Sequence, residues 1–116
     1  MKFRIPIRLP SLANMRSQWE IVSEKKQQKL ATFVALKKAQ ETEPIPSMPL
    51  VVTITRIGPR KLDDDNLAAA CKYVRDQIAK EVGVDDGSDQ YTWMYKQRNG
   101  GSRGYYAVDV EIETRR

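Results

Sequence analysis

Hydrophobic and polar residues alternate at the start of the chain, in the pattern typical of a β-strand. The alternation predicts a strand over residues 2–9, because successive side chains of a strand point to opposite faces. Its apolar positions are Phe3, Ile5, Ile7 and Leu9. Pro6 indicates an edge position in the sheet or an irregularity in the strand, since proline cannot donate a hydrogen bond to a neighbouring strand.

A long helix is predicted over residues 17–40. Its apolar positions fall near one stripe, which consists of Trp19, Val22, Leu30, Phe33 and Val34 and also includes Lys37. The polar segment 24–29 interrupts this stripe, so we expect part of the helix to stand out in solvent. The proline-rich segment 41–49 then connects two halves, neither of which is large enough to bury a core of its own.

The segment 50–57 has the strongest strand pattern in the chain, with β-branched residues on both faces, as expected inside a sheet. A second helix is predicted from about Asp65, and Gly83 ends it. Residues 90–96 and 105–112 predict two strands, joined as a hairpin by the glycine-rich segment 97–104. The predicted order is β-α-β-α-β-β, an α+β fold with a mixed sheet and two helices.

Composition limits the possible functions. The 116 residues fit one domain, spanning residues 1–116, and 20 Lys and Arg against 15 Asp and Glu moderately favour a polyanionic partner. The chain has no histidine, which excludes Ser–His and Cys–His nucleophilic triads, and its single cysteine argues strongly against structural zinc. No stretch approaches the ~20 apolar residues of a membrane span. We therefore expect a cytoplasmic protein without a membrane partner.

The segment KLDDDN places three acids in a row, at Asp63, Asp64 and Asp65, in a basic chain. One interpretation is helix capping, because carboxylates at a helix N-terminus complement its dipole. The other is a Mg²⁺ site: at the end of an extended loop, Asp63 and Asp65 would project to the same side, and a cation relieves the repulsion between two carboxylates. The pattern alone favours capping.

A third acid for such a site is available in Asp85 and Asp86, just past the far end of the same predicted helix. A helix of ~17 residues spans roughly 25 Å, so the loop after Gly83 would have to fold back along it. The residues alone do not predict that convergence.

The whole chain resembles the RusA family of Holliday junction resolvases, which are small bacterial nucleases often carried by prophages. The segment LPSLAN is similar to a proline-bearing turn of the family, Asp63 to Leu67 match its D-x-D-N-L motif, and Val84 to Asp86 match its later apolar-D-D element. The strand before the motif, the basic loop and the predicted C-terminal hairpin also follow the family order. The resemblance implies an intertwined homodimer that cuts a four-way junction, or other branched DNA, at two symmetric positions.

Residue by residue, the resemblance assigns Asp63, Asp65 and Asp86 as catalytic ligands of Mg²⁺, for which Mn²⁺ can substitute. The family's lysine four residues after the second motif acid is replaced here by Ala69. Lys72, on nearly the same helix face, or Lys61 can supply the missing cation, or either can be an ordinary solvated lysine. This departure leaves an inactive nucleic-acid-binding module of the same fold as the alternative function.

Basic residues near the motif and on the predicted hairpin are candidates for contacts with DNA phosphates: Arg56, Arg60, Lys61, Lys96, Arg98 and Arg103. Tyr91, Trp93 and Tyr95 alternate on one strand face, where they either stack on bases or, more commonly, pack in the core or at a dimer contact. Two further functions stay open, a nuclease that prefers flaps or forks and a basic interaction protein that binds no nucleic acid.

Overall fold

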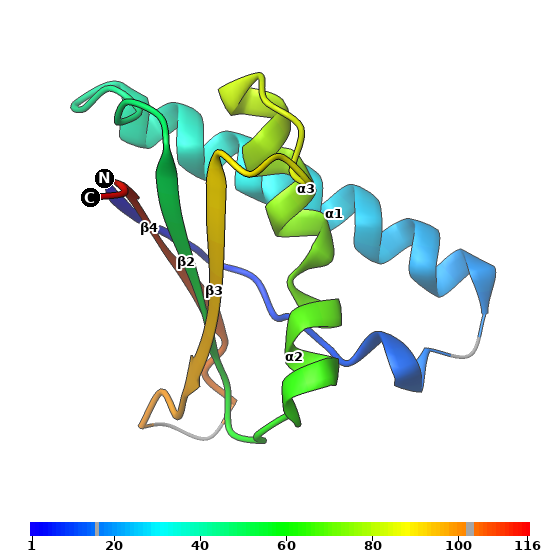
Figure 1. The fold of residues 1–116 in the computed structure, drawn as a ribbon. Helices are drawn as coiled ribbons and strands as arrows, with labels where there is room; N and C mark the ends of the chain where they lie inside the picture. Colours follow the sequence, from blue (N-terminus) through cyan, green and yellow to red (C-terminus); the bar gives the residue numbers. More distant parts are fainter. Residues whose placement is uncertain (16, 102–103) are drawn as a thin grey trace.

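A computed structural model describes residues 1–15, 17–101 and 104–116. Its strands are β1 (Lys2–Ile5), β2 (Leu50–Ile57), β3 (Tyr91–Arg98) and β4 (Ala107–Thr114). Its helices are the short 3₁₀ turn η1 (Leu12–Asn14) and the α-helices α1 (Gln18–Gln40), α2 (Asp64–Ala70) and α3 (Lys72–Val82). The α+β class is confirmed, with three α-helices in place of two, because the second predicted helix is divided at Cys71 (Figure 1).

The four strands form one mixed sheet in the order β1-β4-β2-β3. β2 lies inside the sheet, paired with β3 in parallel and with β4 in antiparallel orientation. β1 lies at an edge and is shorter than the predicted strand over residues 2–9, because it ends at Ile5, directly before Pro6. The predicted hairpin is wrong, because β2 lies between β3 and β4 and the two strands do not pair with each other. The connection after Arg98 therefore crosses the end of β2 and is no tight turn.

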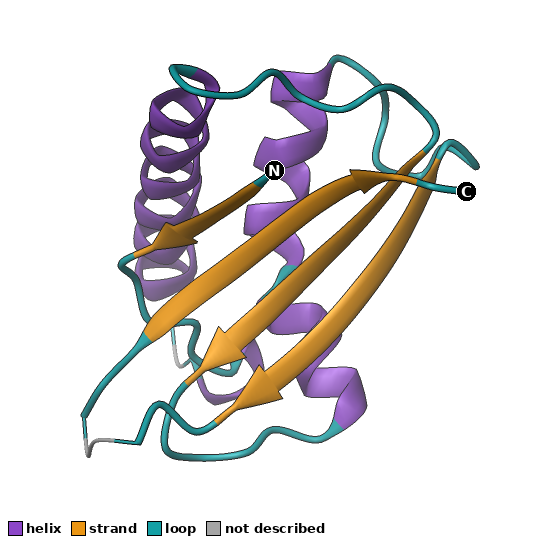
Figure 2. Cartoon of the chain, turned by 90° about the vertical axis from the view of Figure 1, so that its left-hand side faces the viewer, coloured by secondary structure: helices purple, strands orange, loops and turns teal. Residues whose placement is uncertain are grey.

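The helices cover one face of the sheet and leave the other uncovered (Figure 2). Leu50, Val52 and Ile54 of β2 are fully buried beneath the helices, whereas the residues between them are only partly covered. The β-branched residues on both faces of β2 indicated a strand inside the sheet, but only the face toward the helices is fully buried. No helix in the described ranges is both long enough and apolar enough to span a membrane.

α1 buries the face opposite to its apolar stripe. Ser17 caps the helix by accepting a hydrogen bond from the Glu20 backbone N–H at 3.2 Å, which agrees with the predicted start. Its buried residues are Gln28, Thr32 and Leu36, whereas Trp19 is 84% exposed and Leu30 64% exposed. The helix stands out in solvent as expected, but most of its large apolar side chains lie on the solvent side, and Leu36 is a buried exception.

Candidate functional site

The acidic motif follows a loop that β3 holds in place. The Gln97 side-chain amide donates to the Leu62 carbonyl at 2.7 Å, and its oxygen accepts from the Leu62 N–H at 3.0 Å. Both backbone groups of the residue before Asp63 are thus fixed by one side chain of the neighbouring strand. This clamp depends on the parallel pairing of β2 with β3, which places Gln97 opposite Arg56.

Asp63 is the N-cap of α2. Its Oδ1 accepts a hydrogen bond from the Asn66 backbone N–H at 2.9 Å, which satisfies one of the free N–H groups at the start of the helix. The helix already begins at Asp64, so Asp63 and Asp65 are not neighbours on one side of an extended segment. The capping interpretation is confirmed for Asp63, whereas the premise that Asp63 and Asp65 both lie in an extended loop is wrong.

The three acids of the motif carry negative charge that the described cations do not neutralise. Asp63, Asp64 and Asp65 are all exposed, and none forms an ion pair within the described part of the chain. The helix dipole stabilises one or two such charges, by ~0.3–1 kcal/mol each. The arrangement therefore leaves exposed carboxylate oxygens that suit a hard cation.

Asp86 lies in a loop that folds back along α3, as a third ligand would require. Arg75, in the first turns of α3, donates from Nε to Asp86 Oδ2 at 2.9 Å and from its second terminal nitrogen to the Asp86 carbonyl at 3.0 Å. The Trp93 indole N–H donates to the same carbonyl at 2.9 Å. These contacts hold the loop against the side of α3.

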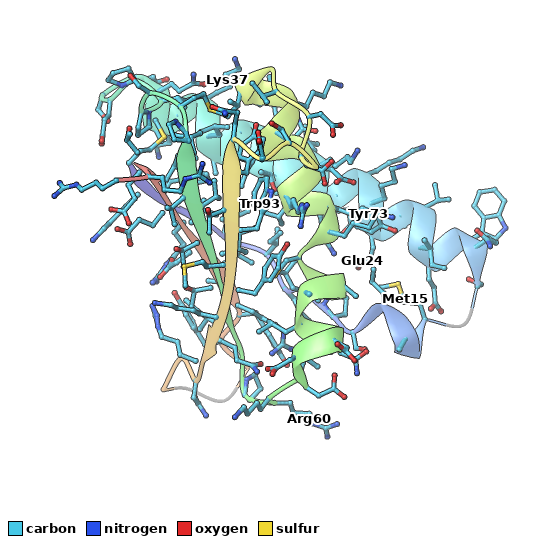
Figure 3. The ribbon with its side chains drawn as sticks, in the orientation of Figure 1. Met15, Glu24, Lys37, Arg60, Tyr73 and Trp93 are labelled. Carbon is cyan, nitrogen blue, oxygen red and sulfur yellow. The ribbon has the colours of Figure 1, made fainter. Side chains whose placement is uncertain are left out.

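The aromatic stripe of β3 faces the helices and fixes this loop. Tyr91 donates to the Val84 carbonyl at 2.8 Å, and its ring stacks on Trp93 with centroids 4.8 Å apart. Tyr95 accepts from Arg75 at 2.7 Å, and the Arg75 guanidinium lies 4.8 Å from the Trp93 ring centroid. Trp93 lies between β3 and α3 in Figure 3. The prediction of a core contact is confirmed for these three residues.

The predicted metal ligands do not meet at one point. Among the described residues, no group of three or more acidic or sulfur side chains is placed to hold a metal ion. Asp63 and Asp65 share the N-terminal end of α2, whereas the Asp86 carboxylate is engaged by Arg75. The exposed pair fits Mg²⁺ in its chemistry, because Mg²⁺ commonly binds one or two carboxylates and completes its shell with waters and substrate phosphates.

The candidate lysines lie near this end of the molecule. Lys61 precedes the motif and is exposed, and Lys72 is exposed at the start of α3. Ala69, at the position of the family lysine, is also exposed, so the surface there has room for a longer side chain. Neither lysine forms an ion pair within the described ranges.

The predicted DNA-binding residues other than Arg56 divide into three groups. Arg60, Lys61 and Arg98 border one cleft at the end of β2 and β3, and Arg60 extends away from the sheet (Figure 3). Lys96 lies on the uncovered face of the sheet, which its strand position predicts. Arg103 falls outside the described residues.

Arg56 differs from the other predicted phosphate ligands because it is 4% exposed. Its Nε donates to the Leu9 carbonyl at 2.8 Å, and one terminal nitrogen donates to the Arg60 carbonyl at 2.7 Å. Arg56 therefore joins the segment after β1 to the loop after β2, and this structural role was not predicted.

Sequence reasoning missed Gln97 and Arg75, the two side chains that fix the acidic segments. Neither carries a local signal, because each acts on a backbone segment that only the sheet topology brings near. Comparison of the chain with protein-family models, curated proteins and solved structures finds no match. The resemblance to the RusA family therefore stays a prediction from the sequence, and the hairpin that contributed to it is not present.

Proposed function

We propose that this protein is a Mg²⁺-dependent endodeoxyribonuclease that resolves four-way DNA junctions in recombination and repair, in the cytoplasm of a bacterial or phage-infected cell. The observation that carries the proposal is the exposed pair Asp63 and Asp65, which no described cation neutralises and which directly follows the basic loop with Arg60 and Lys61. A basic surface beside unneutralised carboxylates suits a phosphodiester substrate together with a divalent ion.

In this proposal Asp63 and Asp65 hold Mg²⁺ through the oxygens left free by capping. When bound, the ion supplies Lewis acidity that activates a water and offsets charge on the phosphate. Arg60 and Lys61 position the DNA backbone beside the acids, and Lys72 offsets charge that develops on the leaving oxygen. Asp86 joins the site only after its carboxylate leaves Arg75, or when a second protomer contributes it.

We also propose a homodimer formed through α1. The exposed apolar residues Trp19, Leu30 and Val34 lie on one face of this helix, and an exposed apolar face of this kind indicates an association surface. A two-fold dimer presents two equivalent acidic sites, which matches the two-fold symmetry of a four-way junction. The area that these side chains bury on pairing would favour association by ~25 cal/mol per Å² of apolar surface.

An inactive junction-binding module is the second candidate. Two observations favour it. Ala69 stands where the family has a lysine, so that positive charge is missing. The Asp86 carboxylate is already paired with Arg75, at 2.9 Å, and is not free to bind a metal ion. Such a protein would bind branched DNA through Arg60, Lys61 and Arg98 in a salt-dependent manner and would not need Mg²⁺.

Asp65→Asn separates the two candidates. The substitution preserves the size of an exposed side chain and removes one negative charge from the path of the DNA. If Asp65 is a metal ligand, cleavage of a labelled junction is lost and binding is retained or strengthened. Cleavage by Asp65→Asn at the parental rate would contradict the assignment, and absence of cleavage by the parental protein would favour the inactive module.

A further inference from the structure

A cleft of about 370 Å³ lies between the segment after β1 and the loop after β2. Three arginines line it, Arg8, Arg56 and Arg60, together with the hydroxyl-bearing Ser11 and Tyr106. No aspartate or glutamate is among its lining residues in the described part of the chain. Three positive charges around one solvent-filled space repel one another, so an anion in the cleft would stabilise it.

Arg56 forms the floor of the cleft and is a buried cation without an acidic partner in the described ranges. Its two hydrogen bonds go to the carbonyls of Leu9 and Arg60, which fix its orientation but carry only partial charge. Burial lowers the pKa of Arg56, and the charge of Arg8 lowers it further. The attraction between an anion and a guanidinium is stronger in these buried surroundings than at an exposed site, because the effective dielectric constant is lower.

Contacts within the protein hold two of the three arginines of the cleft, Arg8 and Arg56, in place. The Arg8 guanidinium lies 5.0 Å from the centroid of the Tyr106 ring. Gly58 lies against both Tyr106 and Arg56, since a Cβ there would come within 3.3 Å of the Tyr106 ring and 3.4 Å of the Arg56 guanidinium. A smaller cleft of about 290 Å³ shares Arg56 and Arg60. Arg8 and Arg56, which these contacts hold in place, lose less conformational entropy when they bind an anion than mobile arginines would.

We propose that the Arg8–Arg56–Arg60 cleft binds a phosphate group. Guanidinium groups match phosphate oxygens in geometry and charge, and Ser11 and Tyr106 can donate hydroxyl hydrogen bonds. Leu62, the residue before Asp63, also lines the cleft, so a phosphate bound there lies next to the acidic motif. The identification of its source as the DNA backbone rests on the proposed function, whereas the anion site itself does not.

The test is a titration followed by NMR of the Arg56 side chain. Its Nε–H is buried and hydrogen-bonded, so its ¹H–¹⁵N resonance should be observable and should respond to an ion in the cleft. We expect a saturable shift with inorganic phosphate and with dimethyl phosphate, compared with sodium chloride at equal ionic strength. The shift should disappear in Arg8→Gln/Arg60→Gln and persist in Lys38→Gln, which removes one charge from the far end of α1 (Figure 1).

The probes distinguish the two sources of the phosphate group. If the Arg56 shift saturates with dimethyl phosphate as well as with inorganic phosphate, the ligand is a phosphodiester of the DNA backbone. If it saturates with inorganic phosphate alone, the cleft is a site for a free anion. A shift that follows ionic strength only, equal in chloride and phosphate, overturns the proposal.

Junction binding in EDTA provides a second readout that does not depend on catalysis. Arg8→Gln/Arg60→Gln should reduce the slope of log K against log salt by ~0.9 for each DNA phosphate that the protein no longer neutralises. If phosphate binds but the parental protein never cuts DNA, the nuclease proposal fails and the cleft remains. If the protein cuts junctions with Mg²⁺ and neither phosphate probe gives a saturable shift of the Arg56 resonance, the cleft proposal fails and the nuclease proposal remains.

Discussion

Asp63 is both a helix cap and a proposed metal ligand, and two substitutions separate these roles. As the N-cap it accepts one hydrogen bond from Asn66 N–H, and as a proposed metal ligand it supplies negative charge. Asparagine retains the acceptor and removes the charge, whereas alanine removes both. We therefore expect Asp63→Asn and Asp63→Ala to lose cleavage equally and to differ in stability.

The difference in stability follows from the capping hydrogen bond. Replacing an N-cap Asp by Ala costs about 0.5–2 kcal/mol, and Asn is as good an N-cap as Asp. The charge–dipole contribution of ~0.3–1 kcal/mol is removed in both variants. Asp63→Ala should therefore be less stable than Asp63→Asn by ~1 kcal/mol, the typical worth of a cap.

Urea unfolding followed by circular dichroism at pH 7 measures this difference, and the two variants should share one m-value. Added Mg²⁺ should stabilise the parental protein by RT ln(1 + [Mg²⁺]/Kd) and should leave both variants unchanged. Equal stability of the Asn and Ala variants would refute the capping role. Mg²⁺ stabilisation that persists in Asp63→Asn would refute its role as a ligand.

Three further predictions concern other parts of the molecule. Leu30→Glu should convert the proposed parental dimer to a monomer, as measured by light scattering. The protomer should lose no stability, because Leu30 is exposed in it. A parental protein that is itself monomeric would contradict the proposed interface. Burial raises the pKa of the Cys71 thiol to about 12, so iodoacetamide should label it slowly at pH 8 and rapidly in urea; rapid labelling of the native protein would show that the thiol is accessible. The hydrogen bond from Arg4 lowers the pKa of Asp109 below its ordinary value of 3.8. The stability advantage over Asp109→Asn should therefore be complete at pH 7 and shrink as the pH falls below 3.8 toward the folded-state value; an advantage that is constant down to pH 2 would contradict this.

Local signals predicted the elements of this fold well. Ser17 and Gly83 mark helix ends through capping, and Gly83 adopts the left-handed conformation at φ 88° that glycine favours. The β-branched segment 50–57 is the central strand. Each of these features depends on contacts within a few residues, which a sequence pattern records directly.

The errors arose where distant segments meet. The strands on either side of the glycine-rich segment suggested a hairpin, but β2 inserts between them. α1 buries Gln28 and Thr32 and exposes Trp19. Its inner face is determined by its contacts with α3 and β1, and the spacing of its large apolar residues did not predict that face. Arg56 looks like a surface cation in the sequence and is buried in the structure.

The candidate site was predicted in part. The position of Asp63 at a helix start was predicted and is observed, whereas the return of the Asp86 loop along α3 is observed but was not predicted from the residues. The contacts that hold these segments, from Gln97 and Arg75, depend on strand pairing and on a loop that folds back, so no spacing in the sequence could reveal them. The roles of the acids in binding a metal remain predictions.

The most direct test is cleavage of a labelled four-way junction by the parental protein, in Mg²⁺ and in EDTA, beside linear duplex of the same sequence. We expect paired symmetric cuts that require Mg²⁺, spare the duplex and disappear in Asp65→Asn. Tight binding of the junction without cuts under all conditions would contradict the proposed nuclease and would leave the three adjacent acids as the capped start of α2.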